Sequence, residues 1–170
     1  MASRNTCVAV YPACSHLTVA LQGLREAGCD LGLVSVLGQA RVDAEQAVGF
    51  FRSGGRFHYH GPQAAFWQAL GGLLNTTAVV RQSEAVLLIV VGHLAAVMMR
   101  ETMDSEVGGG FSLHGAALHT IGIPRDGIIE YEQAVQNENL LLLVHGAHEE
   151  VEQACSVLHS EHQQVTVHVG

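Results

Sequence analysis

The stretch AVLLIVVGHLAAVMM, residues 85–99, decides how the middle of this chain folds. It contains no charged residue, and Glu84 and Arg100 flank it. As a helix it would be about 22 Å long, which is shorter than the ~30 Å hydrocarbon core of a bilayer. The consecutive apolar residues 86–91 would point to every side of a helix, so neither face is suited to water. The stretch therefore needs a cover of protein or lipid.

The composition indicates a folded, acidic protein. The chain has 170 residues, of which 48% are hydrophobic, and this is ample for one domain with a real core. All eight basic residues are arginine, against sixteen acidic residues, which gives a formal net charge of −8. Surfaces that bind nucleic acid or anionic lipid are rich in basic residues, so the charge argues against both partners. The N-terminus MASRNTCVAVYP has no apolar run of signal-peptide length, and we expect a cytoplasmic protein.

The first part of the chain, residues 1–40, has the pattern strand, helix, strand. The segment TCVAVYP is β-branched and alternating, and LGLVSVLG is again extended in character. Between them, Leu17, Leu21 and Leu24 recur at helical spacing, and Gly28 follows as a stop signal.

The last part, residues 138–170, repeats this pattern. LLLLVHG is a continuous apolar strand, QVTVHV alternates, and the helix between them places Val151, Ala154 and Leu158 on one face. Two strand-helix-strand units of matching length can share one sheet. We therefore predict an α+β fold of the ferredoxin-like type, a four-stranded antiparallel sheet with two helices on one face, built from residues 1–40 and 138–170.

Residues 41–137 form an insertion between these halves. Its apolar part, about residues 62–103, consists of AAFWQALGGLLNTTAVV and the opening stretch, separated by RQSE. Asn75 interrupts the first segment and Ser83 is placed to cap the second, which favours an apolar helical hairpin followed by connecting helices. The opposite interpretation stays open, because AVLLIVV is rich enough in Val and Ile to be a buried strand. Pro124 is placed to begin a further helix, RDGIIEYEQAVQ.

The order of motifs resembles that of a known family. VDAEQAV, GFFRSGGR, GPQAAFWQALGGLL, ALHTIGIPRDGIIEYEQAV and LLLLVHGAHEEVEQA follow one another as in the YflT-like proteins of the bacterial general stress family. The similarity is best over residues 42–74 and 115–154. It implies a small α/β domain interrupted by an apolar hairpin, with a stress-related or membrane-associated role and no catalytic residue to carry over. In the family the hairpin is more continuously apolar, whereas NTTAVVRQSE interrupts it here.

The cover of the apolar insertion leads to a hypothesis about function. Burying one large apolar side chain contributes about 1.5–3 kcal/mol, so a dozen of them cannot stay in water. We predict that copies of the chain cover one another, which gives a non-enzymatic structural or stress-associated protein that assembles into a ring, shell or filament. Insertion of the hairpin into a membrane and a compact monomer are the alternatives. The predicted interface consists of Phe66, Trp67, Leu70, Leu74, Leu87, Val91, Leu94 and Met98.

The histidines suggest a further alternative, a metal-binding or metal-sensing module. There are eleven, and several have pairwise spacing that suits a metal: His58 with His60, His145 with His148, and His159 with His162. No pair has a third and fourth ligand at specific spacing, so we predict no metal site and no cofactor. His93 lies inside the apolar run, where a charged imidazole would be costly to bury.

No catalytic template fits the chain. The cysteines, Cys7, Cys14, Cys29 and Cys155, have neither C-x-x-C nor zinc spacing, and we expect reduced thiols. Cys14 precedes His16 at a helix start, where thiolates are favoured, but no orienting partner is identifiable. We predict no catalytic residue, the sequence identifies no small-molecule substrate, and the expected partner is a second copy of the chain.

Overall fold

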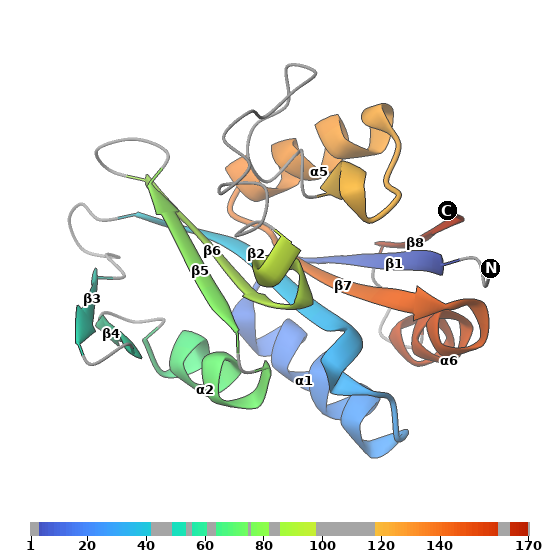
Figure 1. Cartoon of the computed structure of the whole chain (residues 1–170), viewed down its shortest axis with the longest axis horizontal. Coiled ribbons are helices and arrows are strands. Elements are labelled where there is room, and N and C mark those ends of the chain that lie inside the picture. Colours follow the sequence, from blue (N-terminus) through green and yellow to red (C-terminus); the bar gives the residue numbers. More distant parts are fainter. Residues whose placement is uncertain are drawn as a thin grey trace.

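The computed structural model describes residues 4–41, 49–53, 56–60, 64–74, 76–81, 86–97, 118–159 and 164–169. The strands are β1 (Arg4–Tyr11), β2 (Val34–Arg41), β3 (Gly49–Ser53), β4 (Arg56–His60), β5 (Thr77–Arg81), β6 (Val86–Gly92), β7 (Leu140–Ala147) and β8 (Gln164–Val169). The longer helices are α1 (Cys14–Glu26), α2 (Ala64–Leu74), α5 (Arg125–Gln136) and α6 (His148–His159). The fold is α+β, as predicted. Six antiparallel strands form one sheet in the order β5-β6-β2-β7-β1-β8, and β3 pairs with β4 in a separate small sheet (Figure 1).

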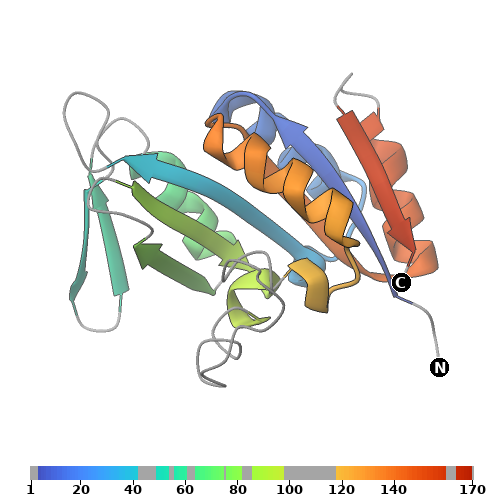
Figure 2. The same cartoon turned by 90° about the horizontal axis from the view of Figure 1, so that it is seen from above.

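Helices cover both faces of the large sheet. Helices α1, α2 and α6 lie on one side and α5 on the other, as Figures 1 and 2 show together. Successive residues of a strand point to opposite faces. In β1, Cys7 and Ala9 therefore join the core under α1, α2 and α6, whereas Val8 joins the core under α5. A sheet covered on both faces needs continuous apolar strands, which explains the run of leucines in β7.

The two strand-helix-strand units are present with the helix faces that the sequence predicts. Helix α1 buries Leu17, Leu21 and Leu24. In the second unit, Val151, Ala154 and Leu158 of α6 are buried in the same core as the leucines of α1. Strand β7 lies between β1 and β2, and β1 lies between β7 and β8, so the strands of each unit enclose one strand of the other.

The predicted helical hairpin of residues 62–103 is correct for Ala64–Leu74 and wrong for Thr77–Arg81 and Val86–Gly92, which are strands. Residues 64–74 are helix α2, but Val86–Gly92 is the strand β6. In the second segment, only residues 93–97 of the described range 86–97 are helical. The open strand alternative therefore holds. The reason lies in tertiary structure: β6 pairs with β2 and β5, Ile89 and Val91 enter one core, and Leu88 and Val90 enter the other. An all-round apolar run is what a strand buried on both faces requires.

The large sheet has six strands instead of the four predicted, because β6 and β5 add to the edge at β2. Strand β5, TAVVR, lies within NTTAVVRQSE, the stretch that interrupts the apolar hairpin in the sequence.

Within the described ranges, each helix is too short or too polar to span a bilayer.

Candidate functional site

Buried polar side chains gather at one end of the large sheet. Among the described residues, Asn5, Thr6 and Ser35 are polar and at most 3% exposed. Thr6 pairs with His145 of β7 and with His168 of β8, and Ser35 pairs with Gly92 at the end of β6. We call the group formed by these side chains and their histidine neighbours the polar end; it comprises Asn5, Thr6, Ser35, His93, His145, His148 and His168.

Thr6 joins two segments to β1. Its hydroxyl donates a hydrogen bond to the carbonyl oxygen of Ile121, at 2.8 Å, and lies 2.8 Å from Nδ1 of His145. Because the hydroxyl proton is directed to Ile121, the hydroxyl oxygen accepts from His145, which places a proton on Nδ1 of that ring. Thr6 is fully buried, so no substrate can reach its hydroxyl. The hydrogen bonds of Thr6 to Ile121 and His145 are therefore structural, and they hold these segments together.

His93 packs against the His145 side of the contact between Thr6 and His145. Its ring stacks on that of His145, with centroids 5.8 Å apart and an interplanar angle of 12°. The helix that starts at His93 is held from the sheet, because the backbone N–H of Leu94 donates to the hydroxyl of Ser35 at 2.8 Å. This bond satisfies one of the amide groups that the first turn of a helix leaves without a partner. Both contacts fix the end of β6 on the α5 face.

Asn5 forms the corresponding contact on the opposite face of β1. Its amide nitrogen lies 2.9 Å from Nδ1 of His148, the first residue of α6, and Nε2 of His148 lies 3.1 Å from a carboxylate oxygen of Glu152. His148 therefore bonds on the α6 side of the sheet and His145 on the α5 side. The proposed clasp of these two histidines around a metal is not formed, because the neighbouring residues Asn5 and Thr6 direct them to opposite faces.

The other histidine pairs give no further support for a metal site. The side chains of His58, His60 and His159, and residue His162, lie outside the described part of the chain. Over the described residues, no group of three or more His, Cys, Asp or Glu side chains is arranged to hold a metal ion.

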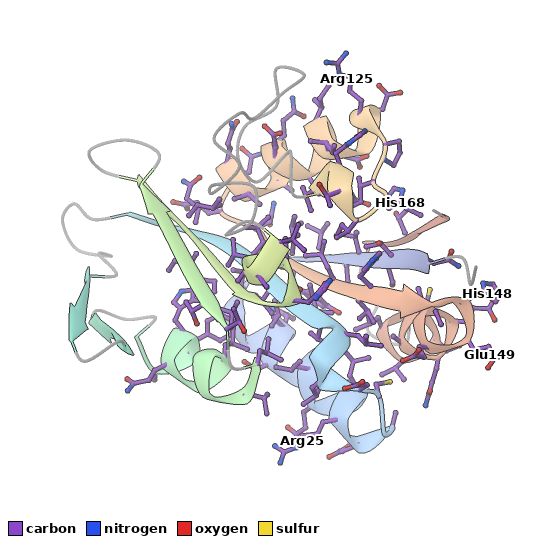
Figure 3. All side chains as sticks on the ribbon, viewed as in Figure 1. Arg25, Arg125, His148, Glu149 and His168 are labelled. Atoms are coloured by element: carbon purple, nitrogen blue, oxygen red, sulfur yellow. The ribbon has the colours of Figure 1, made fainter. Side chains whose placement is uncertain are left out.

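A buried tyrosine and a partly buried histidine connect α5 to the edge strand β8. The hydroxyl of Tyr131 lies 2.7 Å from Nε2 of His168, and the rings meet edge to face. Burial raises the pKa of Tyr131 to about 12. Burial also lowers the pKa of His168, against the opposing effect of the nearby Glu130 carboxylate. Both shifts favour the neutral pair, in which the tyrosine donates to the histidine. Figure 3 shows His168 on the side of α5 and His148 at the start of α6.

The lowered pKa of His168 predicts that the stability of the fold depends on pH. Because the folded pKa of His168 is below the unfolded value of 6.5, the unfolded chain binds this proton first. The contribution of the pair is present above pH ~6.5 and is lost as the pH falls through the folded pKa. Between pH 7.5 and 5, the free energy of unfolding should fall less for His168→Gln than for wild type. Urea unfolding at both pH values measures this difference. The exposed His16→Gln serves as the control, and an equal effect of both substitutions would contradict this assignment.

The cysteines offer no activated nucleophile at α1. All four are free thiols. Burial raises the pKa of Cys14, and this outweighs the opposing backbone hydrogen bond. A raised pKa is the reverse of what an activated thiol needs. His16 is exposed on the same helix. The hypothesis of a Cys14–His16 site therefore gains no support.

The predicted oligomer interface needs correction. Trp67, Leu70, Leu74 and Val91 are buried in the chain's own core beneath α2, and Leu94 is buried in the core beneath α5. These five side chains therefore form no surface of the folded chain. Phe66 is partly buried against the first core, the side chain of Leu87 is not among those described, and Met98 lies outside the described residues. An apolar pattern shows that a side chain needs a cover but does not show which part of the protein supplies it.

Sequence reasoning missed most of the polar end. Thr6 and Ser35 are single small polar residues in apolar strands, and such residues are common at exposed positions. Their partners are distant: Ile121 and His145 follow Thr6 by 115 and 139 residues. The one usable signal is a polar residue at a position where the alternation of the strand predicts burial.

Comparison of the chain with models of protein families, with curated proteins and with solved structures finds no match.

Proposed function

We propose that the chain is a non-enzymatic structural protein, associated with stress, which binds copies of itself through the outer face of α2. The stress association rests on the resemblance to the YflT-like proteins. The self-association rests on the uncharged exposed face of α2.

The order of strands supports a ferredoxin-like core. In β2-β7-β1-β8, each strand-helix-strand unit has one strand of the other unit between its own two strands, and α1 and α6 pack into one core. This is the split arrangement that a ferredoxin-like sheet has. In this proposal, residues 41–137 are an insertion that extends the core at the β2 edge.

Helix α2 differs from the other long helices in its exposed face. Helices α1, α5 and α6 carry charged residues in addition to their buried side chains, but α2 has none along its whole length, AAFWQALGGLL. Among the residues of α2 whose burial is described, the exposed ones are Ala65, Gln68, Ala69 and Gly72. Small side chains let two helices approach closely, since the distance between helix axes depends on the residues at the contact.

The charge of the chain makes a second copy the favoured partner for this face. Copies with a net charge of −8 repel one another. An uncharged surface is where two copies meet with the least repulsion. Phe66 and Leu73 flank the face and are only partly buried, so they add apolar area that a second copy would cover. The corrected interface is thus the side of α2 opposite to Trp67, Leu70 and Leu74.

We expect light scattering of the wild-type protein without detergent to give the mass of two or more chains of 18.1 kDa each. Ala69→Glu places a charge in the middle of the exposed face of α2 and should yield monomers with an unchanged circular dichroism spectrum. Val19→Glu is the matched control, because Val19 is 55% exposed on α1 and lies outside the proposed interface. A monomeric wild type at all concentrations, or an assembly that Ala69→Glu leaves intact, would refute the proposal.

A further inference from the structure

Two thiols from distant parts of the chain meet between β1 and α6. Cys7 lies in the middle of β1, is 0% exposed, and belongs to the core beneath α1, α2 and α6. Cys155 lies in α6 and is partly buried against the same core. The two thiols are neighbours, and burial of Cys7 together with the adjacent Cys155 raises the pKa of Cys7. The remaining cysteines have no comparable arrangement, since Cys14 and Cys29 lie beyond opposite ends of the buried face of α1, roughly 20 Å apart along a helix of this length.

We propose that Cys7 and Cys155 are a redox-sensitive modification site, at which a hydroperoxide converts the thiol pair into a disulfide that links β1 to α6. The site lies on α6 and not on α2, so the inference does not depend on self-association.

The two thiols have different roles because their exposure differs. Cys155 is the one that an external oxidant reaches, and its thiolate attacks the peroxide oxygen, which forms a sulfenic acid and releases water after protonation. The sulfur of Cys7 then attacks the sulfur of Cys155, which forms the S–S bond and expels hydroxide; the proton of Cys7 completes a second water. In total, two thiols and hydrogen peroxide give one disulfide and two waters, and two electrons pass to the peroxide.

Burial of Cys7 determines how its thiol reacts. A buried thiol with a raised pKa is protected from direct oxidation, because the thiolate is the reactive form. Cys7 therefore reacts only with an oxidised sulfur that is already beside it. We expect slow formation of the bond and preference for the internal partner over thiols in solution. The bond joins the central strand β1 to α6 and closes a long loop, which restricts the unfolded chain.

The test uses the full chain with Cys14→Ser and Cys29→Ser, so that only the proposed pair remains. After reduction and removal of the reductant, hydrogen peroxide should consume both thiols and lower the intact mass by about 2 Da, the signature of one disulfide. Peptide mapping without reductant should find Cys7 joined to Cys155, and dithiothreitol should restore both thiols. The closed loop should also raise Tm by about 5 °C.

The matched control adds Cys155→Ser to the same background, at a partly buried position where a hydroxyl is tolerated. Circular dichroism checks its fold. Cys7 alone should keep its thiol under the same peroxide treatment. Three results would overturn the inference: stepwise oxygen addition to Cys155 without a cross-link, covalent dimers through Cys155, or equally rapid oxidation of Cys7 in the control.

Discussion

Replacement of Gly92 by alanine is expected to lower the free energy of unfolding by about 3 kcal/mol or more. Gly92 has a φ of +101°, a conformation that residues with a side chain rarely adopt. A Cβ atom there would lie 2.2 Å from the carbonyl oxygen of Val34 and 3.0 Å from Cα of Ser35. Both neighbours are backbone atoms of β2, so the clash cannot be relieved by rotation of a side chain.

The position of Gly92 explains why the effect should be large. Its N–H donates to the carbonyl oxygen of Thr76 at 2.7 Å, and it pairs with Ser35, which in turn accepts from Leu94. Gly92 thus ends β6 and directs the chain into residues 93–97, beside the polar end. A shift of its backbone would disturb each of these bonds.

The matched control is Gly28→Ala, because Gly28 has a φ of +80° but open space around the position of a Cβ. Only the conformational penalty applies there, roughly 1 kcal/mol. Urea unfolding followed by circular dichroism measures both variants. If the two substitutions have equal effects, the close approach of β2 to Gly92 is not what makes glycine necessary.

The sequence predicts those parts of the fold in which local pattern and tertiary partner agree. The leucines of α1 and the apolar face of α6 recur at helical spacing, and both helices bury these residues. In Val86–Gly92 the local pattern is compatible with either a buried helix or a buried strand. The pairing of β6 with β2 and β5 decides between them, and this pairing brings together residues distant in sequence.

The candidate site was less predictable for the same reason. The spacing of His145 and His148 suggests a pair, but spacing along the chain does not show that β7 ends and α6 begins between them. Asn5 and Thr6 then hold the two rings on opposite faces of β1. Cys7 and Cys155 meet only because α6 packs on β1, so their separate positions in the sequence carry no signal of the pair.

Trp67 of α2 is fully buried and meets Phe66 edge to face with ring centroids 5.0 Å apart. Its six-membered ring lies over Gly38 of β2: a Cβ at Gly38 would be 2.7 and 2.8 Å from two ring carbons and 2.6 Å from Cδ2 of Leu140. Trp67→Ala should lower the free energy of unfolding by about 3–5 kcal/mol through the cavity it leaves. Gly38→Ala should lower it by about 1–3 kcal/mol through overpacking.

Combined substitutions test whether these two residues share one contact. Trp67→Leu removes the ring atoms that a methyl group at Gly38 would meet, so Gly38→Ala should destabilise the Trp67→Leu protein by clearly less than it destabilises wild type. Gly72→Ala is the control, because nothing lies within 4 Å of a Cβ at Gly72, and its effect should add to that of Trp67→Leu. Additive effects in both pairs would exclude the contact.

The dependence on protein concentration separates this role of Trp67 from the predicted interface role. A side chain that stabilises a contact between copies contributes more as the protein concentration rises, by mass action. Trp67 packs inside its own chain, so its contribution to the monomer should be the same at low and high concentration. The measurement therefore uses Ala69→Glu as the background, in which we expect the chains to be separate. If the effect of Trp67→Ala grows with concentration in wild type and disappears in this background, Trp67 acts between copies and not within one.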